Sequence, residues 1–159
     1  MRLALLIMLC AASVASLAAQ DTPQSNLHTG QEEYLRQAAL AIQRHIGKPY
    51  AWGESGLKSF DCSGFVWRVM FESGILMKRT SARKLYMSFP QVSEREQWHF
   101  GNIVFFDNLK HCGIINSRTD FYHADCKKGT TLSRFAPHWQ DKLCGVRGVL
   151  KKSGSRNTL

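Results

Sequence analysis

The feature that most constrains this chain is a change of hydrophobic period partway along it. Up to residue 89 the apolar residues recur every three or four positions, as they do on one face of an α-helix. After residue 100 they form short apolar or alternating runs separated by turn residues, a pattern typical of an antiparallel sheet. Helices followed by strands within one short chain predict an α+β fold.

Helices are expected in the first part of the chain. The predicted helices cover residues 31–46, a segment that begins near residue 62 and closes at Gly74, and residues 81–89. Thr29 and Glu32 have the spacing of a capping box ahead of the first helix. Either Ser59 or Asp61 can cap the second helix, which places Cys62 in or just before its first turn.

Strands are expected in the second part, and one domain holds both parts. The predicted strands cover residues 103–106, 112–116, 120–124 and 146–150. We expect the domain to span residues 31–150, with a linker at 20–30 before it and a polar, disordered tail at 151–159 after it. Such a length has room for a single core, and we expect the protein to be a monomer.

The first residues have the composition of an export signal. Arg2 supplies a positive charge, residues 3–9 form an unbroken apolar run, and small residues follow at 11–19. The apolar run is too short to span a bilayer, so we expect residues 1–19 to be a signal peptide and the mature chain to have no transmembrane anchor. Cys10 follows a leucine where a lipoprotein signal requires a small residue. The prediction is a secreted or periplasmic protein.

The mature chain is expected to be strongly basic. Arg2 is the one basic residue lost with the signal, so 20 Lys and Arg against 12 Asp and Glu leave a net charge of +8. This charge favours contact with anionic envelope polymers, a contact that salt weakens. Nucleic acid is not expected as a partner, because no basic stretch is interleaved with aromatic residues. A basic surface that serves solubility alone is the alternative.

Four cysteines remain after removal of the signal. They are Cys62, Cys112, Cys126 and Cys144. In an oxidising compartment four cysteines predict two disulfides. If Cys62 is a catalytic thiol, at most one bridge can form among the other three, and the sequence does not choose the pair.

Cys62 has the expected setting of a reactive thiol. A sulfur at the start of a helix lies near unpaired backbone N–H groups and the positive end of the helix dipole, which favour the thiolate. A thiolate nucleophile needs a proton shuttle, and histidine is suited to that role. His111 begins a predicted strand and His123 lies on the next, where one imidazole can orient the other. Each residue also has an alternative without a catalytic role. Cys62 could be a buried or disulfide-bonded structural cysteine, His111 a surface residue at the sheet edge, and His123 a half-buried histidine with its hydrogen bonds satisfied.

A zinc site is a rival interpretation of the same residues. His111, Cys112, His123 and Cys126 together supply four ligands of the kind that zinc prefers. Adjacent residues on a strand point to opposite faces, however, so His111 and Cys112 are poorly placed to share one metal. We therefore expect no metal and no cofactor.

Three further residues are candidates for substrate contact. Asp61 and Ser63 flank the cysteine and could bind a substrate amine, although both are also ordinary helix caps. Tyr50 lies in the Gly- and Pro-containing loop at 48–59, where it could line a cleft or anchor the loop in the core.

The residues taken together resemble the NlpC-type cell-wall endopeptidases. The matching pieces are GKPYAWG at 47–53, FDCSGFVWRVM at 60–70, RTS at 79–81, GNIVFF at 101–106, HCGII at 111–115 and FYHA at 121–124. They occur in the order of the family and cover about 100 residues. The resemblance implies a papain-like fold with N-terminal helices packed on a central antiparallel β-sheet. It also implies that Cys62 is the nucleophile, His111 the general base and His123 the residue that orients the base.

The resemblance also carries expectations about the substrate. Family substrates are peptidoglycan stem peptides, commonly cut between γ-D-glutamate and a diamino acid. Tyr50 is expected to support the thiolate or the oxyanion, and Asp61 and Ser63 to bind the end of the stem peptide. The expected function is thus a secreted cysteine endopeptidase. A catalytically silent wall-binding module and an amidase acting on a non-peptidoglycan amide are the alternatives.

The sequence departs from the family pattern at three positions. Glu54 stands where a second glycine is usual, Asn102 where an aspartate usually opens the strand, and Cys112 where a small apolar residue is typical. None of these changes removes a catalytic group. With Glu54 at this position, the sequence does not decide which substrate group the adjacent subsite binds. Cys112 adds a thiol beside His111.

Overall fold

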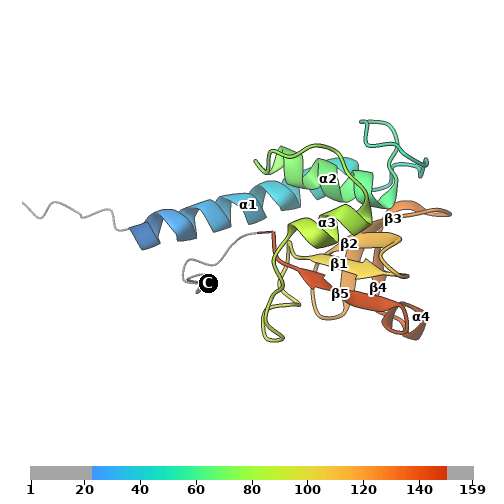
Figure 1. The fold of residues 1–159 in the computed structure, drawn as a ribbon. Coiled ribbons are helices and arrows are strands. Elements are labelled where there is room, and N and C mark those ends of the chain that lie inside the picture. The colour runs from blue at the N-terminus through green and yellow to red at the C-terminus, as the bar shows by residue number, and fades with distance from the viewer. Residues whose placement is uncertain (1–22, 150–159) are drawn as a thin grey trace, which may run out of the picture.

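The computed structural model of the protein describes residues 23–149 and confirms the α+β order of helices and strands. The elements, shown in Figure 1, are α1 (Pro23–His45), α2 (Cys62–Glu72), α3 (Ala82–Ser88), β1 (Ile103–Phe106), β2 (His111–Ile115), β3 (Asp120–Asp125), β4 (Gly129–Arg134), α4 (Pro137–Gln140) and β5 (Leu143–Arg147). The predicted signal peptide at 1–19 and the predicted tail at 151–159 lie outside the described residues.

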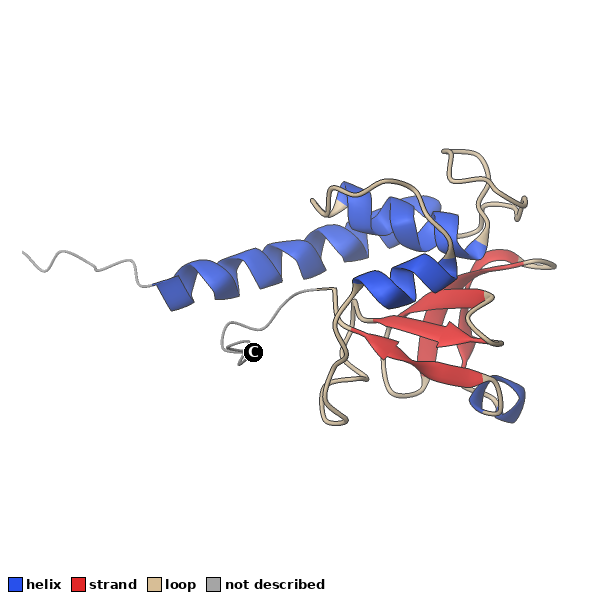
Figure 2. Ribbon diagram, in the orientation of Figure 1, coloured by secondary structure: helices blue, strands red, loops and turns tan. Residues whose placement is uncertain are grey.

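The strands form one antiparallel sheet in the order β4-β3-β2-β1-β5. Figure 2 shows α1, α2 and α3 gathered on one side of this sheet and α4 apart from them, beyond the strands. Helix α2 packs directly against β2 and β3 as well as against α1. This arrangement brings the start of α2 to the sheet, where the histidines lie.

Both faces of the sheet are covered. On the face toward the helices, Phe105, Cys112 and Ile114 pack in one cluster with buried residues of α1, α2 and α3. On the other face, Phe106 and Phe121 belong to a second cluster that includes the half-buried Val92, Trp98, Phe135 and Trp139. Because successive strand residues point to opposite faces, β1 is buried along its whole length.

The prediction for the start of α1 is wrong. The helix begins at Pro23, so residues 23–30 are helical although they were expected to form a linker. Thr29 lies inside the helix and does not cap it. Proline suits the first helical position, because the backbone N–H that it lacks has no partner within the helix there. The helix then continues as far as the turn at Gly47, whose positive φ of 80° is typical of a residue that follows a helix end.

The other two predicted helices are confirmed with small shifts. Asp61, one of the two candidate caps, is the N-cap of α2 and accepts a hydrogen bond from the Gly64 N–H at 2.6 Å. Ser81 caps α3 in the same way by accepting from the Lys84 N–H. Cys62 is therefore the first residue of α2, as the capping pattern predicted.

The predicted strands are right in part. Strand β1 matches the prediction residue for residue, β2 begins and ends one residue earlier than predicted, and β3 ends one residue later. Strand β5 lies three residues earlier than expected, and β4 and α4 were not predicted. The sequence of β4, GTTLSR, has no apolar run, because its second half alternates between half-buried and exposed positions at the sheet edge.

The start of α2 makes a close contact that only glycine allows. A Cβ on Gly64 would overlap the backbone carbonyl of Glu54, which in turn accepts a hydrogen bond from the Asp61 N–H at 2.9 Å. We expect Gly64→Ala to lower the free energy of unfolding by about 1–3 kcal/mol, the usual cost of overpacking. Thermal unfolding followed by circular dichroism measures the change.

The matched control is Gly30→Ala in α1. No atom beyond its chain neighbours and the backbone of its own helix lies within 4 Å of the position of its Cβ, so alanine should raise the free energy of unfolding by up to about 1 kcal/mol. Equal melting temperatures for the Gly64→Ala variant and the unmodified protein would contradict the close approach of the loop to α2.

Candidate functional site

Cys62 occupies the first position of α2, next to the start of β2. Its side chain is 8% exposed, and its Sγ lies 3.8 Å from the Lys110 carbonyl oxygen. Residues 107–109 form the turn between β1 and β2 and all have positive φ, between 52° and 65°. This left-handed turn directs Lys110 and His111 back toward the start of α2.

The pKa of the Cys62 thiol is lowered to about 5. The largest cause is a hydrogen bond with the Cys112 thiol; burial opposes the shift, and a hydrogen bond and the charge of His111 add to it. The pKa of Cys112 is raised well above its ordinary value, because this side chain is completely buried and lies beside Cys62. Cys112 is therefore a thiol that donates, and Cys62 is a thiolate at neutral pH.

His111 and His123 are joined by a short hydrogen bond. The distance from His111 Nε2 to His123 Nδ1 is 2.8 Å, and the rings are nearly perpendicular at 88°. Burial lowers the pKa of His123 to about 3, helped by the charge of His111, so His123 is neutral at neutral pH. A neutral ring can accept the His111 N–H at Nδ1, which leaves the other nitrogen of His111 for Cys62.

Ser133 of β4 completes this chain of contacts. Its Oγ lies 2.9 Å from His123 Nε2. If Nδ1 of His123 accepts, Nε2 must carry the proton and donate to Ser133, so the serine fixes the tautomer of the ring. Ser133 could not be predicted from the sequence, because β4 has no apolar run that marks it as a strand.

Asp61 connects three segments around the cysteine. Its carboxylate accepts hydrogen bonds from the Gly53 N–H at 3.0 Å, from the Ser63 hydroxyl at 3.0 Å and from the Gly64 N–H. Arg79, in the RTS piece, adds an ion pair with distances of 2.6 and 2.7 Å to the two oxygens. Asp61 and Ser63 are both buried, and they hold the loop before α2 in place.

Tyr50 lies near the same group. The pKa of its hydroxyl is raised by burial and by the negative charges of Cys62, Asp61 and Cys126. Tyr50 therefore keeps its proton and can donate a hydrogen bond. The structure thus brings Cys62, His111, His123 and Tyr50 together, with Asp61 and Ser63 directly behind the cysteine.

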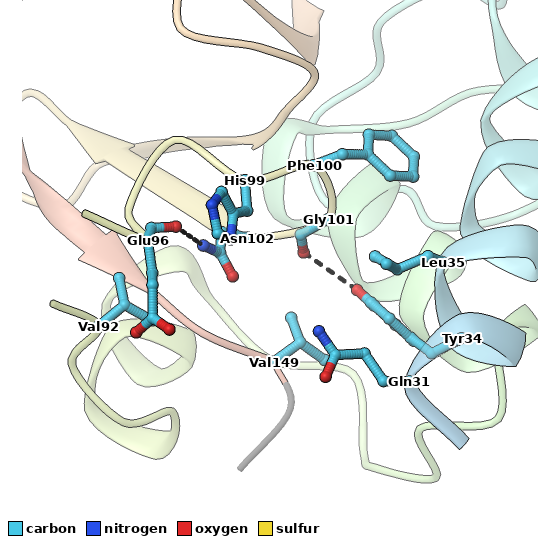
Figure 3. Close-up of a pocket in the computed structure, with 10 residues that line it drawn as sticks. All are labelled: Gln31, Tyr34, Leu35, Val92, Glu96, His99, Phe100, Gly101, Asn102 and Val149. Atoms are coloured by element: carbon cyan, nitrogen blue, oxygen red, sulfur yellow. Dashed lines mark hydrogen bonds between the residues drawn. The ribbon is translucent and has the colours of Figure 1, made fainter. Parts of the chain in front are cut away.

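The departures from the family pattern have different surroundings. The Glu54 side chain is exposed on the loop before α2. Asn102 donates to the carbonyl oxygens of Glu96 and Gln97 at 2.8 and 3.3 Å, on a different part of the fold. It lines a pocket of about 230 Å³ between α1 and the loop before β1. Figure 3 shows the residues around this pocket. None of the predicted site residues lines that pocket.

The four cysteines of the described residues are all free, with Cys62 and Cys112 buried and Cys126 and Cys144 exposed. Within residues 23–149, no cluster of three His, Cys, Asp or Glu side chains is arranged to hold a metal ion. Among the helices of the same range, none combines the length and apolar character needed to cross a membrane.

The role of Cys112 can be tested through the reactivity of Cys62. In a background with Cys126→Ala and Cys144→Ala, we expect Cys112→Ala to raise the pH midpoint of Cys62 alkylation by about one unit, because the main donor to the thiolate is lost. The rate of reaction with iodoacetamide, measured from pH 4 to about pH 9, gives the midpoint.

Cys112→Ser is the matched control, because its hydroxyl can still donate. It should keep the midpoint near that of the background protein. An unchanged midpoint in Cys112→Ala would show that the second thiol does not stabilise the first.

Comparison with known proteins gives a consistent match. A family model described as the NlpC/P60 family matches residues 47–148. "Probable endopeptidase p60" of Listeria seeligeri is 47% identical over 75 residues, which cover 45% of this chain and 14% of that protein. "Probable endopeptidase" of Corynebacterium glutamicum is 31% identical over 139 residues, covering 86% of this chain and 64% of that protein. The chain thus spans about one seventh of the length of the Listeria relative.

Solved structures show the same fold. A Staphylococcus aureus protein of the NLP/P60 family is 28% identical with a TM-score of 0.67, and the match covers 76% of this chain and 43% of that one. RipD of Mycobacterium tuberculosis, described as a non-catalytic NlpC/p60 domain protein, is 14% identical with a TM-score of 0.60 over 74% of this chain and 98% of that one. The expected α+β, papain-like fold of the NlpC type is confirmed.

Proposed function

This chain belongs to the NlpC/P60 family, and from that premise we propose that it is a cysteine endopeptidase that hydrolyses peptidoglycan stem peptides. The observation that carries the proposal is the continuous set of contacts from the Cys62 thiolate through His111 and His123 to Ser133. Such a set supplies a nucleophile, a proton shuttle and a residue that orients the shuttle.

The first step is attack of the Cys62 thiolate on the carbonyl carbon of the substrate. A bond forms between sulfur and carbon, and negative charge moves to the carbonyl oxygen. The Gly64 N–H is already used by Asp61, so the N–H groups of Cys62 and Ser63 are the proposed donors to this oxygen, with the Tyr50 hydroxyl beside them.

The second step releases the amine. His111, protonated at the nitrogen that faces Cys62, gives its proton to the leaving nitrogen as the carbon–nitrogen bond breaks. Water then attacks the thioester carbon while His111 takes a proton from it; a carbon–oxygen bond forms, the carbon–sulfur bond breaks, and the carboxyl product leaves the restored thiolate. Throughout, the neutral His123 accepts the Nε2–H of His111 and keeps the ring in one orientation.

The finer substrate assignment follows the family. We propose cleavage between γ-D-glutamate and the diamino acid, with Asp61 and Ser63 at the end of the stem peptide. Asp61 already accepts several hydrogen bonds, so a substrate amine would share this carboxylate with Arg79. The exposed Glu54 adds a second carboxylate on the adjacent loop.

The proposed location is the cell envelope or the medium, after removal of the signal peptide at 1–19. The relatives named endopeptidase p60 and peptidoglycan endopeptidase LytE support an envelope substrate. The net charge of the mature chain would attract anionic envelope polymers and reinforce this location.

A non-catalytic wall-binding module is the second candidate, because RipD shares the fold and is described as adapted to peptidoglycan binding. The lowered pKa of Cys62 and its contact with His111 favour the enzyme. A binding module has no need for a buried thiolate, since burial alone would raise the pKa of that sulfur.

The decisive variant for the function is Cys62→Ala. We expect the mature protein to cut defined muropeptides with new termini at the γ-D-glutamyl bond, and the variant to lose this activity by at least about a thousandfold while keeping its melting temperature. Mass spectrometry of the digests measures both products and rates.

Cys144→Ala is the matched control, because this exposed thiol lies on β5 outside the site and should leave activity unchanged. Full activity in the Cys62→Ala variant would show that Cys62 is not the nucleophile. Intact stem peptides after prolonged digestion by the unmodified protein, with binding to sacculi retained, would favour the wall-binding module.

A further inference from the structure

Helix α4 places an aromatic ring against both histidines of the site. The Trp139 indole stacks on the His111 ring, with centroids 5.2 Å apart and an angle of 26° between the planes. The same indole meets the His123 ring edge to face, at 5.1 Å and 85°. No other tryptophan of the described residues has a ring contact with either histidine.

The indole is held firmly from behind. Its ring lies 4.8 Å from the Phe106 ring and 5.3 Å from the Phe121 ring, in the cluster on the sheet face away from the helices. The backbone is also fixed, because the Trp139 N–H donates to the Ala136 carbonyl at 2.9 Å and the Trp139 carbonyl accepts from the Lys142 N–H at 3.2 Å. The Trp139 indole that stacks on His111 is therefore fixed both by its ring contacts and by its backbone hydrogen bonds.

His111 needs a further contact that fixes the orientation of its ring. It is half-buried at the first position of β2, and its Nε2 is hydrogen-bonded to His123. The hydrogen bond to His123 fixes one atom of the ring but allows the ring to rotate about that contact, which would move the second nitrogen away from Cys62. A flat surface stacked on the ring restricts that rotation, and it keeps the second nitrogen directed at Cys62.

We propose that Trp139 is a positioning residue for His111, holding the imidazole in the plane that reaches Cys62 and His123 at the same time. An indole face attracts a cation as well as a neutral ring, so the stack is maintained when His111 carries a proton. The inference rests on the proposed roles of Cys62 and His111 but not on the identity of the substrate.

The test measures Cys62 itself, without substrate. In the background with Cys126→Ala and Cys144→Ala, we expect Trp139→Leu to raise the pH midpoint of Cys62 alkylation by about half a unit or more, because a mobile His111 stabilises the thiolate less. Trp139→Phe keeps an aromatic plane and should hold the midpoint close to that of the background protein. If the leucine variant does not fold, Trp139→Met supplies a flexible, unbranched side chain without a ring, which adapts better to an irregular gap.

Trp98→Leu is the matched control. Trp98 packs in the same cluster and contacts the Phe135 ring at 5.3 Å, so its loss costs comparable stability without touching the site. An alkylation midpoint in Trp139→Leu equal to that of Trp98→Leu, or equal shifts in the leucine and phenylalanine variants, would overturn the proposal.

Kinetics on muropeptides separate this inference from the proposed function. Trp139→Leu should lower kcat about tenfold with KM unchanged, since the ring acts on the proton shuttle and not on substrate binding. If the unmodified protein cuts no muropeptide while the alkylation midpoints keep the expected order, the substrate assignment fails and the role of Trp139 stands. A change confined to KM would contradict it.

Discussion

The contact between the start of α2 and the start of β2 determines everything else at this site. It places the Cys62 sulfur beside the Lys110 carbonyl, the Cys112 thiol and the His111 ring. The helix is held there by the Asp61 carboxylate, which accepts from the loop before it, from its own first turn and from Arg79. Without that contact the sulfur would be an ordinary buried thiol, because burial alone raises its pKa.

The two covered faces of the sheet have separate tasks. The face under the helices holds Cys112, whose burial keeps it protonated and able to donate to the nucleophile. The other face holds the aromatic cluster and buries His123 completely, which keeps that ring neutral and able to accept. Burial on one face of the sheet thus keeps Cys112 protonated, so that it donates a hydrogen bond. Burial on the other face keeps His123 neutral, so that it can accept one.

Much of the fold and the central residues of the site could be predicted from the sequence. The capping pattern around Asp61 put Cys62 at the start of a helix, and strand periodicity put His111 and His123 on neighbouring strands. The predicted start of α1 was wrong, because a local capping motif does not reveal that the helix already begins before it. Ser133 and Trp139 were missed because β4 has no apolar run and α4 is only four residues long, so their contacts exist only after the sheet closes. The donor role of Cys112 also needed the packing of α2 on β2.

Cys62 is a thiolate at neutral pH because the Cys112 thiol and the His111 ring stabilise the charged sulfur. The most direct measurement is the ultraviolet absorbance of the thiolate as a function of pH, in a protein whose exposed Cys126 and Cys144 are replaced by alanine. We expect a transition of one sulfur near pH 5, absent when Cys62 is replaced by serine. No thiolate below about pH 8.5, the ordinary value for a free cysteine, would contradict it.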